Sequence, residues 1–172
     1  MQVKFLGNEM NLVGNQLKLN DKVNNFKVID NDLNEVSLEN LKGIKVILSV
    51  PSIDTPVCDI EVRRFNQEAQ NINNVDGIYV ISKDLPFAQA RWCGASGIDK
   101  VHVYSDYKYN SFASSTGTLV NELGLLTRAV FILNANNEVI FVDYLDEITH
   151  EPDYNKILDL SLIHISEPTR PY

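Results

Sequence analysis

Two cysteines, Cys58 and Cys93, are the side chains of this sequence best suited to nucleophilic or redox chemistry. Cys58 ends the stretch PSIDTPVC, which directly follows IKVILSV, an apolar run typical of a buried strand. Thr55 can cap a helix N-terminus and Pro56 suits the first helical position, so we expect a helix to begin here. Cys58 would then lie in the first turn of that helix.

The position of Cys58 allows both a structural and a reactive interpretation. Val62 and Phe65 follow it at helical spacing, so Cys58 falls on the core-facing side, where free cysteines are common. The first turn of a helix also offers unpaired N–H groups and the positive end of the dipole, which favour a thiolate. The spacing of Thr55 and Cys58 is that of a capping box in which a thiolate replaces the usual carboxylate.

The helix dipole alone is too weak to make this thiol reactive. A free cysteine has a pKa near 8.5, so a dominant thiolate at pH 7 requires roughly 2.7 kcal/mol of differential stabilisation. The dipole contributes only about 0.3 to 1 kcal/mol. A dominant thiolate at Cys58 would therefore need a further source of stabilisation, most simply a cation.

PSIDTPVC matches the peroxiredoxin pattern P-x-x-x-T-x-x-C, with Pro51, Thr55 and Cys58 at the three fixed positions. The segments VRRFNQEA, DLPFAQARWCG, RAVFIL and DEITHEPDY resemble the thiol peroxidase branch, the atypical two-cysteine peroxiredoxins. The resemblance extends from about residue 2 to about residue 160. It implies a thioredoxin-like fold and the reduction of hydrogen peroxide and organic hydroperoxides by thiol chemistry, without a metal, haem or other cofactor.

The same resemblance implies a role for each candidate residue. Cys58 matches the peroxidatic cysteine, which becomes a sulfenic acid. Thr55 would hydrogen-bond the thiolate and the peroxide, and Pro51 would shield the sulfenic acid from water. Arg128, which opens RAVFIL, matches the active-site arginine and would supply the cation. Cys93 matches the resolving cysteine of an intrachain disulfide, with thioredoxin as reductant and a homodimer as the assembly.

Each of these residues also has a purely structural interpretation. Pro51 can simply end a strand, and Thr55 can serve only as a helix cap. An arginine at the start of a strand, such as Arg128, is usually solvated. Cys93 can be a cysteine packed beside Trp92 in the interior.

The segment SKDLPFAQARWCGASG predicts a short helix, capped by Asp84 and ended by Gly94 or Gly97. Cys93 lies near the C-terminal end of this helix, where the dipole disfavours a thiolate, so we expect it to be the less reactive cysteine. A disulfide requires Cα atoms about 4.4 to 6.8 Å apart. Local unwinding around either cysteine would then be part of turnover.

Strands that alternate with helices predict an α/β fold, with a central mixed sheet flanked by helices and an N-terminal β-hairpin at residues 3 to 19. EVIFVDYL should pair with the strand before it across the turn NANN. A last helix should start near Pro152, with Tyr154, Ile157, Leu158 and Leu162 facing inwards. The remaining expected strands are 26–30, 44–50, 77–83 and 128–134.

The length of 172 residues predicts one domain, which we place at residues 1–160. We expect residues 161–172 to be an atypical tail, because Pro168 and Pro171 break the helix and the segment resembles translated adapter sequence. The 44% hydrophobic residues argue against disorder, and the net charge of −8 argues against nucleic acid binding.

No apolar run is long enough for a signal peptide or a membrane span, so we expect a cytoplasmic protein. Stable structural disulfides are uncommon there, so the two cysteines should be free, metal-bound or redox-cycling.

Other chemistries fit the sequence less well. It contains no C-x-x-C or H-E-x-x-H, and His102, His150 and His164 are isolated. A cysteine hydrolase would need a histidine beside Cys58, for which His102 is the candidate. The main alternative is a thioredoxin-fold redox sensor or binding protein that uses the same cysteine pair as a switch, because a sensor needs the same kind of thiol.

Overall fold

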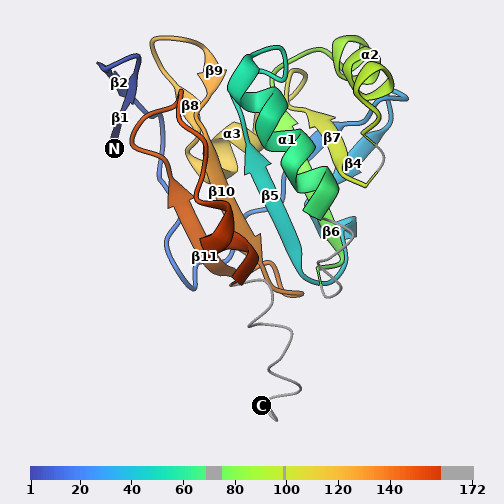
Figure 1. Cartoon of the computed structure of the whole chain (residues 1–172). Helices are drawn as coiled ribbons and strands as arrows, with labels where there is room; N and C mark the ends of the chain where they lie inside the picture. Colours follow the sequence, from blue (N-terminus) through green and yellow to red (C-terminus); the bar gives the residue numbers. More distant parts are fainter. Residues whose placement is uncertain (69–74, 99, 160–172) are drawn as a thin grey trace.

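A mixed sheet of seven strands forms the centre of the computed structural model, which describes residues 1–68, 75–98 and 100–159 (Figure 1). β5 (Lys45–Ser49), β6 (Gly77–Ser82) and β7 (His102–Ser105) run parallel, and the other neighbours pair antiparallel. This arrangement confirms the predicted mixed sheet. In sheet order the strands are β11 (Val139–Tyr144), β10 (Ala129–Leu133), β5 (Lys45–Ser49), β6 (Gly77–Ser82), β7 (His102–Ser105), β3 (Lys27–Ile29) and β4 (Glu35–Ser37).

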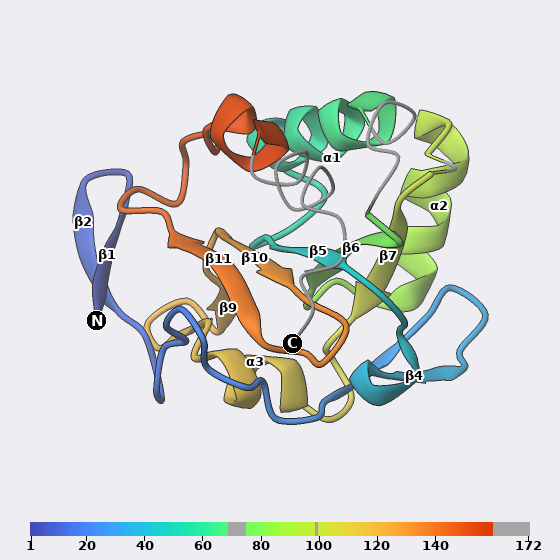
Figure 2. The same ribbon diagram turned by 90° about the horizontal axis from the view of Figure 1, so that it is seen from below.

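Helices cover both faces of this sheet (Figure 2). α1 (Pro56–Glu68), α2 (Pro86–Ser96) and a helical segment at residues 154–159 lie on one face, and α3 (Ser111–Thr116) lies on the other. Alternate residues of each central strand enter the two cores: Val46 and Leu48 pack with α1, whereas Ile47 packs with α3. Burial on both faces explains why these strands read as continuous apolar runs.

The smaller elements lie at the edges of the fold. β1 (Gln2–Phe5) and β2 (Asn8–Asn11) form the N-terminal hairpin, which is shorter than the predicted residues 3 to 19. It ends early because Leu12 pairs instead with Val120 of the small sheet β8 (Leu119–Val120) and β9 (Leu125–Leu126). A short 3-10 helix, η1 (Leu38–Asn40), follows β4. β10 and β11 form the predicted hairpin.

The ends of the helices test the sequence predictions most sharply. The predicted cap of α2 is wrong at its start, because Leu85 is the N-cap and the Asp84 carboxylate bonds elsewhere. Gly97 ends α2 in the left-handed conformation, with φ of 65°, as predicted. The last helix begins at residue 154, and Ile157 is buried as expected. Leu162, His164 and the proposed tail at 161–172 lie outside the described residues.

Candidate active site

Cys58 lies in the first turn of α1 and its side chain is fully buried, at 0% exposure, between the helix and the sheet. Thr55 caps this turn as predicted, since its Oγ1 accepts a bond from the Cys58 N–H at 3.4 Å. The Thr55 hydroxyl donates to the Ser52 carbonyl at 3.0 Å. The Thr55 hydroxyl therefore donates its proton to the backbone of the turn. The family resemblance had implied that it would donate to the Cys58 sulfur.

Arg128 reaches Cys58 from 70 residues downstream and lies with one guanidinium nitrogen 3.0 Å from the sulfur. The register of the sheet explains this approach: β10 pairs with β5 so that Ala129 lies opposite Ser49. The residue before β10 therefore lies beside the turn that follows β5. The predicted cation is thus present next to the thiol.

Three contacts fix the Arg128 guanidinium, which is only 1% exposed. Besides the sulfur, it donates to the Ile148 carbonyl at 2.7 Å and to a Glu61 carboxylate oxygen at 2.5 Å. Burial by itself lowers the pKa of Arg128, but the negative charges of Glu61 and Cys58 outweigh it and raise the pKa. The guanidinium stays charged and offers a fixed positive partner to a thiolate.

Glu61 is a site residue that sequence reasoning missed. Its side chain is 0% exposed, and its second carboxylate oxygen has no hydrogen-bond partner among the described residues. Burial raises the pKa of Glu61 to about 7, although Arg128 opposes this shift. A signal existed, because Glu61 follows Cys58 by three positions and so falls on the buried face of the helix. A lone acid on such a face predicts a buried ion pair.

The loop between β5 and α1 is held by Asp84, the residue predicted to cap α2. One carboxylate oxygen of Asp84 accepts from Ser52 Oγ at 2.7 Å. The other accepts from the Ile53 N–H at 2.9 Å and from Ser82 Oγ at 2.6 Å. Pro51, at the start of this loop, is buried. Asp84 therefore positions the segment that leads into Cys58.

Cys93 lies in the C-terminal part of α2 and is partly exposed. It packs against the same core as Cys58, but it also lines a cavity of about 250 Å³ together with Asp30, Asn31 and His102. Burial raises the pKa of the Cys93 thiol, and a hydrogen bond with Asn31 opposes that rise. Both cysteines are free thiols, so this is the reduced form of the pair.

His102, the candidate partner of a hydrolytic cysteine, belongs to the cavity at Cys93. Its ring stacks on Tyr79 and on Tyr104, with ring centroids 5.5 Å and 6.1 Å away. Cys58 bonds instead to Arg128. The geometry therefore gives a hydrolase mechanism no support.

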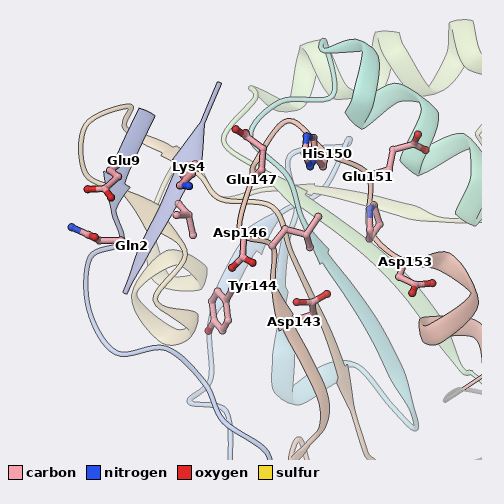
Figure 3. A pocket seen from close by; sticks show the side chains of 13 residues that line it. Gln2, Lys4, Glu9, Asp143, Tyr144, Asp146, Glu147, His150, Glu151 and Asp153 are labelled. Carbon is pink, nitrogen blue, oxygen red and sulfur yellow. The ribbon is translucent and has the colours of Figure 1, made fainter. Parts of the chain in front are cut away.

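A pocket of about 800 Å³ lies between the N-terminal hairpin and the segment that follows β11 (Figure 3). Acidic side chains dominate its lining, among them Asp143, Asp146 and Glu147. Burial would raise the pKa of Glu147, but bonds from Thr149, Gly7 and Leu6 lower it to about 2. Within residues 1–68, 75–98 and 100–159, no three or more His, Cys, Asp or Glu side chains are grouped to hold a metal ion.

Comparisons with known proteins agree on one family. The family model described as Redoxin matches residues 18–158. The chain is 48% identical to a thiol peroxidase of Clostridium acetobutylicum over 158 residues, which is 92% of this chain and 96% of that protein. It is 47% identical to a thiol peroxidase of Bacillus subtilis over 159 residues, 92% of this chain and 95% of that protein.

Solved structures are similar along almost the whole chain. A peroxiredoxin-like protein from Aquifex aeolicus has a TM-score of 0.88 at 37% identity and covers 94% of this chain and 96% of its own. A thiol peroxidase from Chromobacterium violaceum has a TM-score of 0.87 at 19% identity, covering 96% and 98%, which bears on the fold alone. These matches confirm the predicted thioredoxin-like fold. None of the helices in the described part of the chain could span a membrane.

Proposed function

Since the chain belongs to the thiol peroxidases of the redoxin family and is a peroxiredoxin-type oxidoreductase, we propose that Cys58 is the peroxidatic nucleophile and Cys93 its resolving partner. The activity of this family is that of a peroxidase, and its role is antioxidant. The observation that carries the residue assignment is the Arg128 guanidinium nitrogen, 3.0 Å from a buried sulfur in the first turn of a helix. Hydrogen peroxide and organic hydroperoxides are the proposed substrates.

In the first step the Cys58 thiolate attacks one peroxide oxygen. The S–O bond forms as the O–O bond breaks, and the leaving oxygen takes up a proton to depart as water or an alcohol. Cys58 is oxidised to a sulfenic acid. Arg128 and the helix N-terminus stabilise the negative charge on sulfur and then on the leaving oxygen. Thr55 and Pro51 shape the turn that admits the peroxide and excludes water.

In the second step the Cys93 sulfur attacks the sulfur of the sulfenic acid. The S–S bond forms, the S–O bond breaks, and the hydroxyl leaves as water with the proton of the Cys93 thiol. A dithiol reductant then returns both sulfurs to thiols, and we propose thioredoxin for this task. Its attack should fall on Cys93, because Cys93 is partly exposed and because the departing Cys58 thiolate is stabilised by Arg128.

We also propose a homodimer, which the family resemblance implies, and a cytoplasmic location, which is the expectation drawn from the sequence. Sedimentation of the reduced protein tests the dimer, and fractionation of cells that produce the protein tests the location.

Titration of the reduced protein with peroxide, followed by intact mass, tests the chemistry. Wild type should gain one disulfide, a loss of two hydrogens, per equivalent of peroxide. Cys58→Ser should not react at a comparable rate. Cys93→Ser should still acquire the first oxygen, detected as a dimedone adduct, but should not turn over with thioredoxin. If Cys58→Ser consumes peroxide as fast as wild type, the assignment of Cys58 is wrong.

Catalytic turnover distinguishes the proposed peroxidase from a redox sensor. Sustained peroxide consumption with thioredoxin and its reductase supports the enzyme. A protein that forms the disulfide once, resists every dithiol reductant and binds a partner in one redox state only would instead be a sensor.

A further inference from the structure

The neighbours of the two cysteines are bonded to each other. Asp59 follows Cys58 in α1, and Trp92 precedes Cys93 in α2. The indole N–H of Trp92 donates to one carboxylate oxygen of Asp59 at 2.8 Å. α1 and α2 lie side by side on the same face of the sheet, so this bond joins the two cysteine-bearing helices (Figure 2).

Arg63 strengthens the same connection one turn further along α1. Its Nε donates to the second Asp59 oxygen at 2.9 Å, and its NH2 nitrogen donates to Ser96 Oγ at 2.9 Å. Ser96 is the last residue of α2. Together Asp59, Arg63, Trp92 and Ser96 form a continuous set of contacts between the helices, which we call the Asp59 latch.

The latch exists only while both segments are helical. The Asp59 N–H bonds to the Thr55 carbonyl at 3.0 Å, as the first turn of α1 requires, and Gly97 closes α2 by bonding to the Cys93 carbonyl. Meanwhile the two sulfurs have different surroundings: Cys58 contacts Arg128, and Cys93 lines the cavity beside the 30–32 turn.

In a disulfide the two Cβ atoms lie about 3.8 Å apart. Because Cys58 contacts Arg128 and Cys93 lines the cavity beside Asp30 and Asn31, we expect at least one of the two segments to change conformation when the bond forms. A change of backbone at Cys58 or Cys93 moves the adjacent Asp59 or Trp92 and breaks the bond between them.

We propose that Asp59 is a positioning residue that opposes the unwinding needed to form the Cys58–Cys93 disulfide. The proposal rests on the proposed function, in which Cys93 attacks the Cys58 sulfenic acid and water leaves. While the latch holds, the sulfenic acid persists and a second peroxide can oxidise it to the sulfinic acid. The latch thus sets the ratio between productive disulfide and over-oxidised protein.

A structural role alone would have different consequences. An exposed ion pair one turn apart, such as Asp59 with Arg63, contributes little to global stability. Trp92→Phe keeps an aromatic ring in the core contact and removes the N–H donor. The latch therefore predicts a change in local opening at the cysteines with only a small change in the denaturation midpoint.

Trp92→Phe and Arg63→Ala are the test variants, and Arg64→Ala is the matched control. Arg64 also lies on α1 and also makes an i,i+4 ion pair, with Glu68, but it belongs to no contact of the latch. Rapid quenching after one equivalent of peroxide, followed by intact mass, measures the rate of disulfide formation. We expect about a tenfold increase for Trp92→Phe, a smaller one for Arg63→Ala and none for Arg64→Ala.

With a large excess of peroxide, the sulfinic form, a gain of two oxygens at Cys58, should fall in the same order. Unchanged or slower disulfide formation in Trp92→Phe, with first oxidation of Cys58 intact, overturns the latch and leaves the proposed function standing.

Hydrogen exchange of the reduced proteins provides a measurement that needs no peroxide. In Trp92→Phe the amides of the first turn of α1 and the last turn of α2 should exchange several-fold faster, while those of β5 and β10 keep their protection. Faster local exchange without any oxidation of Cys58 would retain the latch and refute the proposed function. Equal exchange in Trp92→Phe and wild type would refute the latch.

Discussion

The turns that carry Cys58 and Cys93 place the same side chain in opposite environments. Cys58 lies at the N-terminal end of its helix, fully buried, with a guanidinium nitrogen 3.0 Å from its sulfur. Cys93 lies near the C-terminal end of its helix, partly exposed, and burial without a cation raises the pKa of its thiol. Helix direction and one long-range contact therefore distinguish the surroundings of the two thiols, as the proposed roles of nucleophile and resolving cysteine require.

Burial also acts differently in the two places. At Cys58 it removes water from around a charged partner, which strengthens the attraction between sulfur and guanidinium. At Cys93 it removes water from a thiol that Asn31 hydrogen-bonds, and the net effect disfavours the thiolate. Burial therefore strengthens a contact with a charged partner at Cys58, whereas at Cys93 it raises the pKa of the thiol.

Substitution of Arg128 should remove most of the difference between the surroundings of Cys58 and Cys93. Of the changes considered, it should lower the peroxide rate the most. Arg128→Ala leaves Cys58 without its cation and Glu61 buried without its partner, so we expect the peroxide rate to fall about 10² to 10³-fold. Arg128→Lys keeps a charge but cannot contact Glu61 and sulfur at once, so its rate should be intermediate. Stopped-flow oxidation of Cys58 measures both. A rate for Arg128→Ala within a few-fold of wild type would contradict the role of the cation.

Glu61 should make the Cys58 region sensitive to pH. Its pKa rises from 4.5 to about 7 in the folded protein, so the folded state holds its proton more tightly. The raised pKa of Glu61 therefore stabilises the folded state fully below pH 4.5, and this stabilisation is lost as pH rises to about 7. The loss should amount to about 3 kcal/mol at 1.36 kcal/mol per unit.

Urea denaturation from pH 4.5 to 7.5 gives the free energy of unfolding of wild type and of Glu61→Gln at each pH. The wild-type value should fall relative to that of Glu61→Gln as pH rises. Glu68→Gln, on the same helix and paired with Arg64, is the control and should parallel wild type. Parallel curves for wild type and Glu61→Gln would exclude a raised pKa at Glu61.

The Cys58 turn was more predictable from sequence than the contacts around it. Thr55 and Pro56 are local signals for a helix start, and the structure begins α1 at Pro56. The approach of Arg128 depends on the pairing of Ala129 with Ser49, a long-range register that no local pattern encodes. Only the family resemblance suggested it. Glu61 could have been found, because helical spacing from Cys58 places it on the buried face.

Asp84 shows why the local rule failed elsewhere. An acid two residues before a proline reads as a helix cap, yet its carboxylate bonds to Ser52 and Ile53 of another loop. Leu85 takes the N-cap position instead. A distant partner with two donors outcompetes the local N–H groups, and sequence spacing contains no information about that competition.

Substitution of Asp84 should therefore disturb the turn that carries Cys58. Asp84→Ala removes the acceptor for Ser52, Ile53 and Ser82, so we expect the peroxide rate to fall about tenfold through misplacement of the turn. Asp54→Ala is the control, because Asp54 is an exposed acid in the β5–α1 loop, the loop that Asp84 contacts. Alkylation of Cys58 by iodoacetamide should change less than peroxide reduction. A tenfold loss in Asp54→Ala as well would attribute the effect to charge.

The smallest expected effect concerns Cys93. Because burial raises the pKa of its thiol, Cys93 in a Cys58→Ser protein should react with iodoacetamide at pH 8 a few-fold more slowly when folded than when unfolded in urea. The midpoint of its pH profile should lie above that of the unfolded chain. Asn31→Ala should slow it further, since the hydrogen bond with Asn31 lowers the pKa of Cys93.

Mass spectrometry of the alkylated protein measures each rate, and the unfolded protein corrects for the intrinsic reactivity of the thiol. If folded Cys93 reacts as fast as Cys58 does in a Cys93→Ser protein at pH 7, the environments of the two turns do not distinguish the thiols. The order of attack would then have to come from access of the peroxide alone. A slower Cys93 instead supports the proposal that the ionic environment of Cys58 makes it the first thiol to react with peroxide.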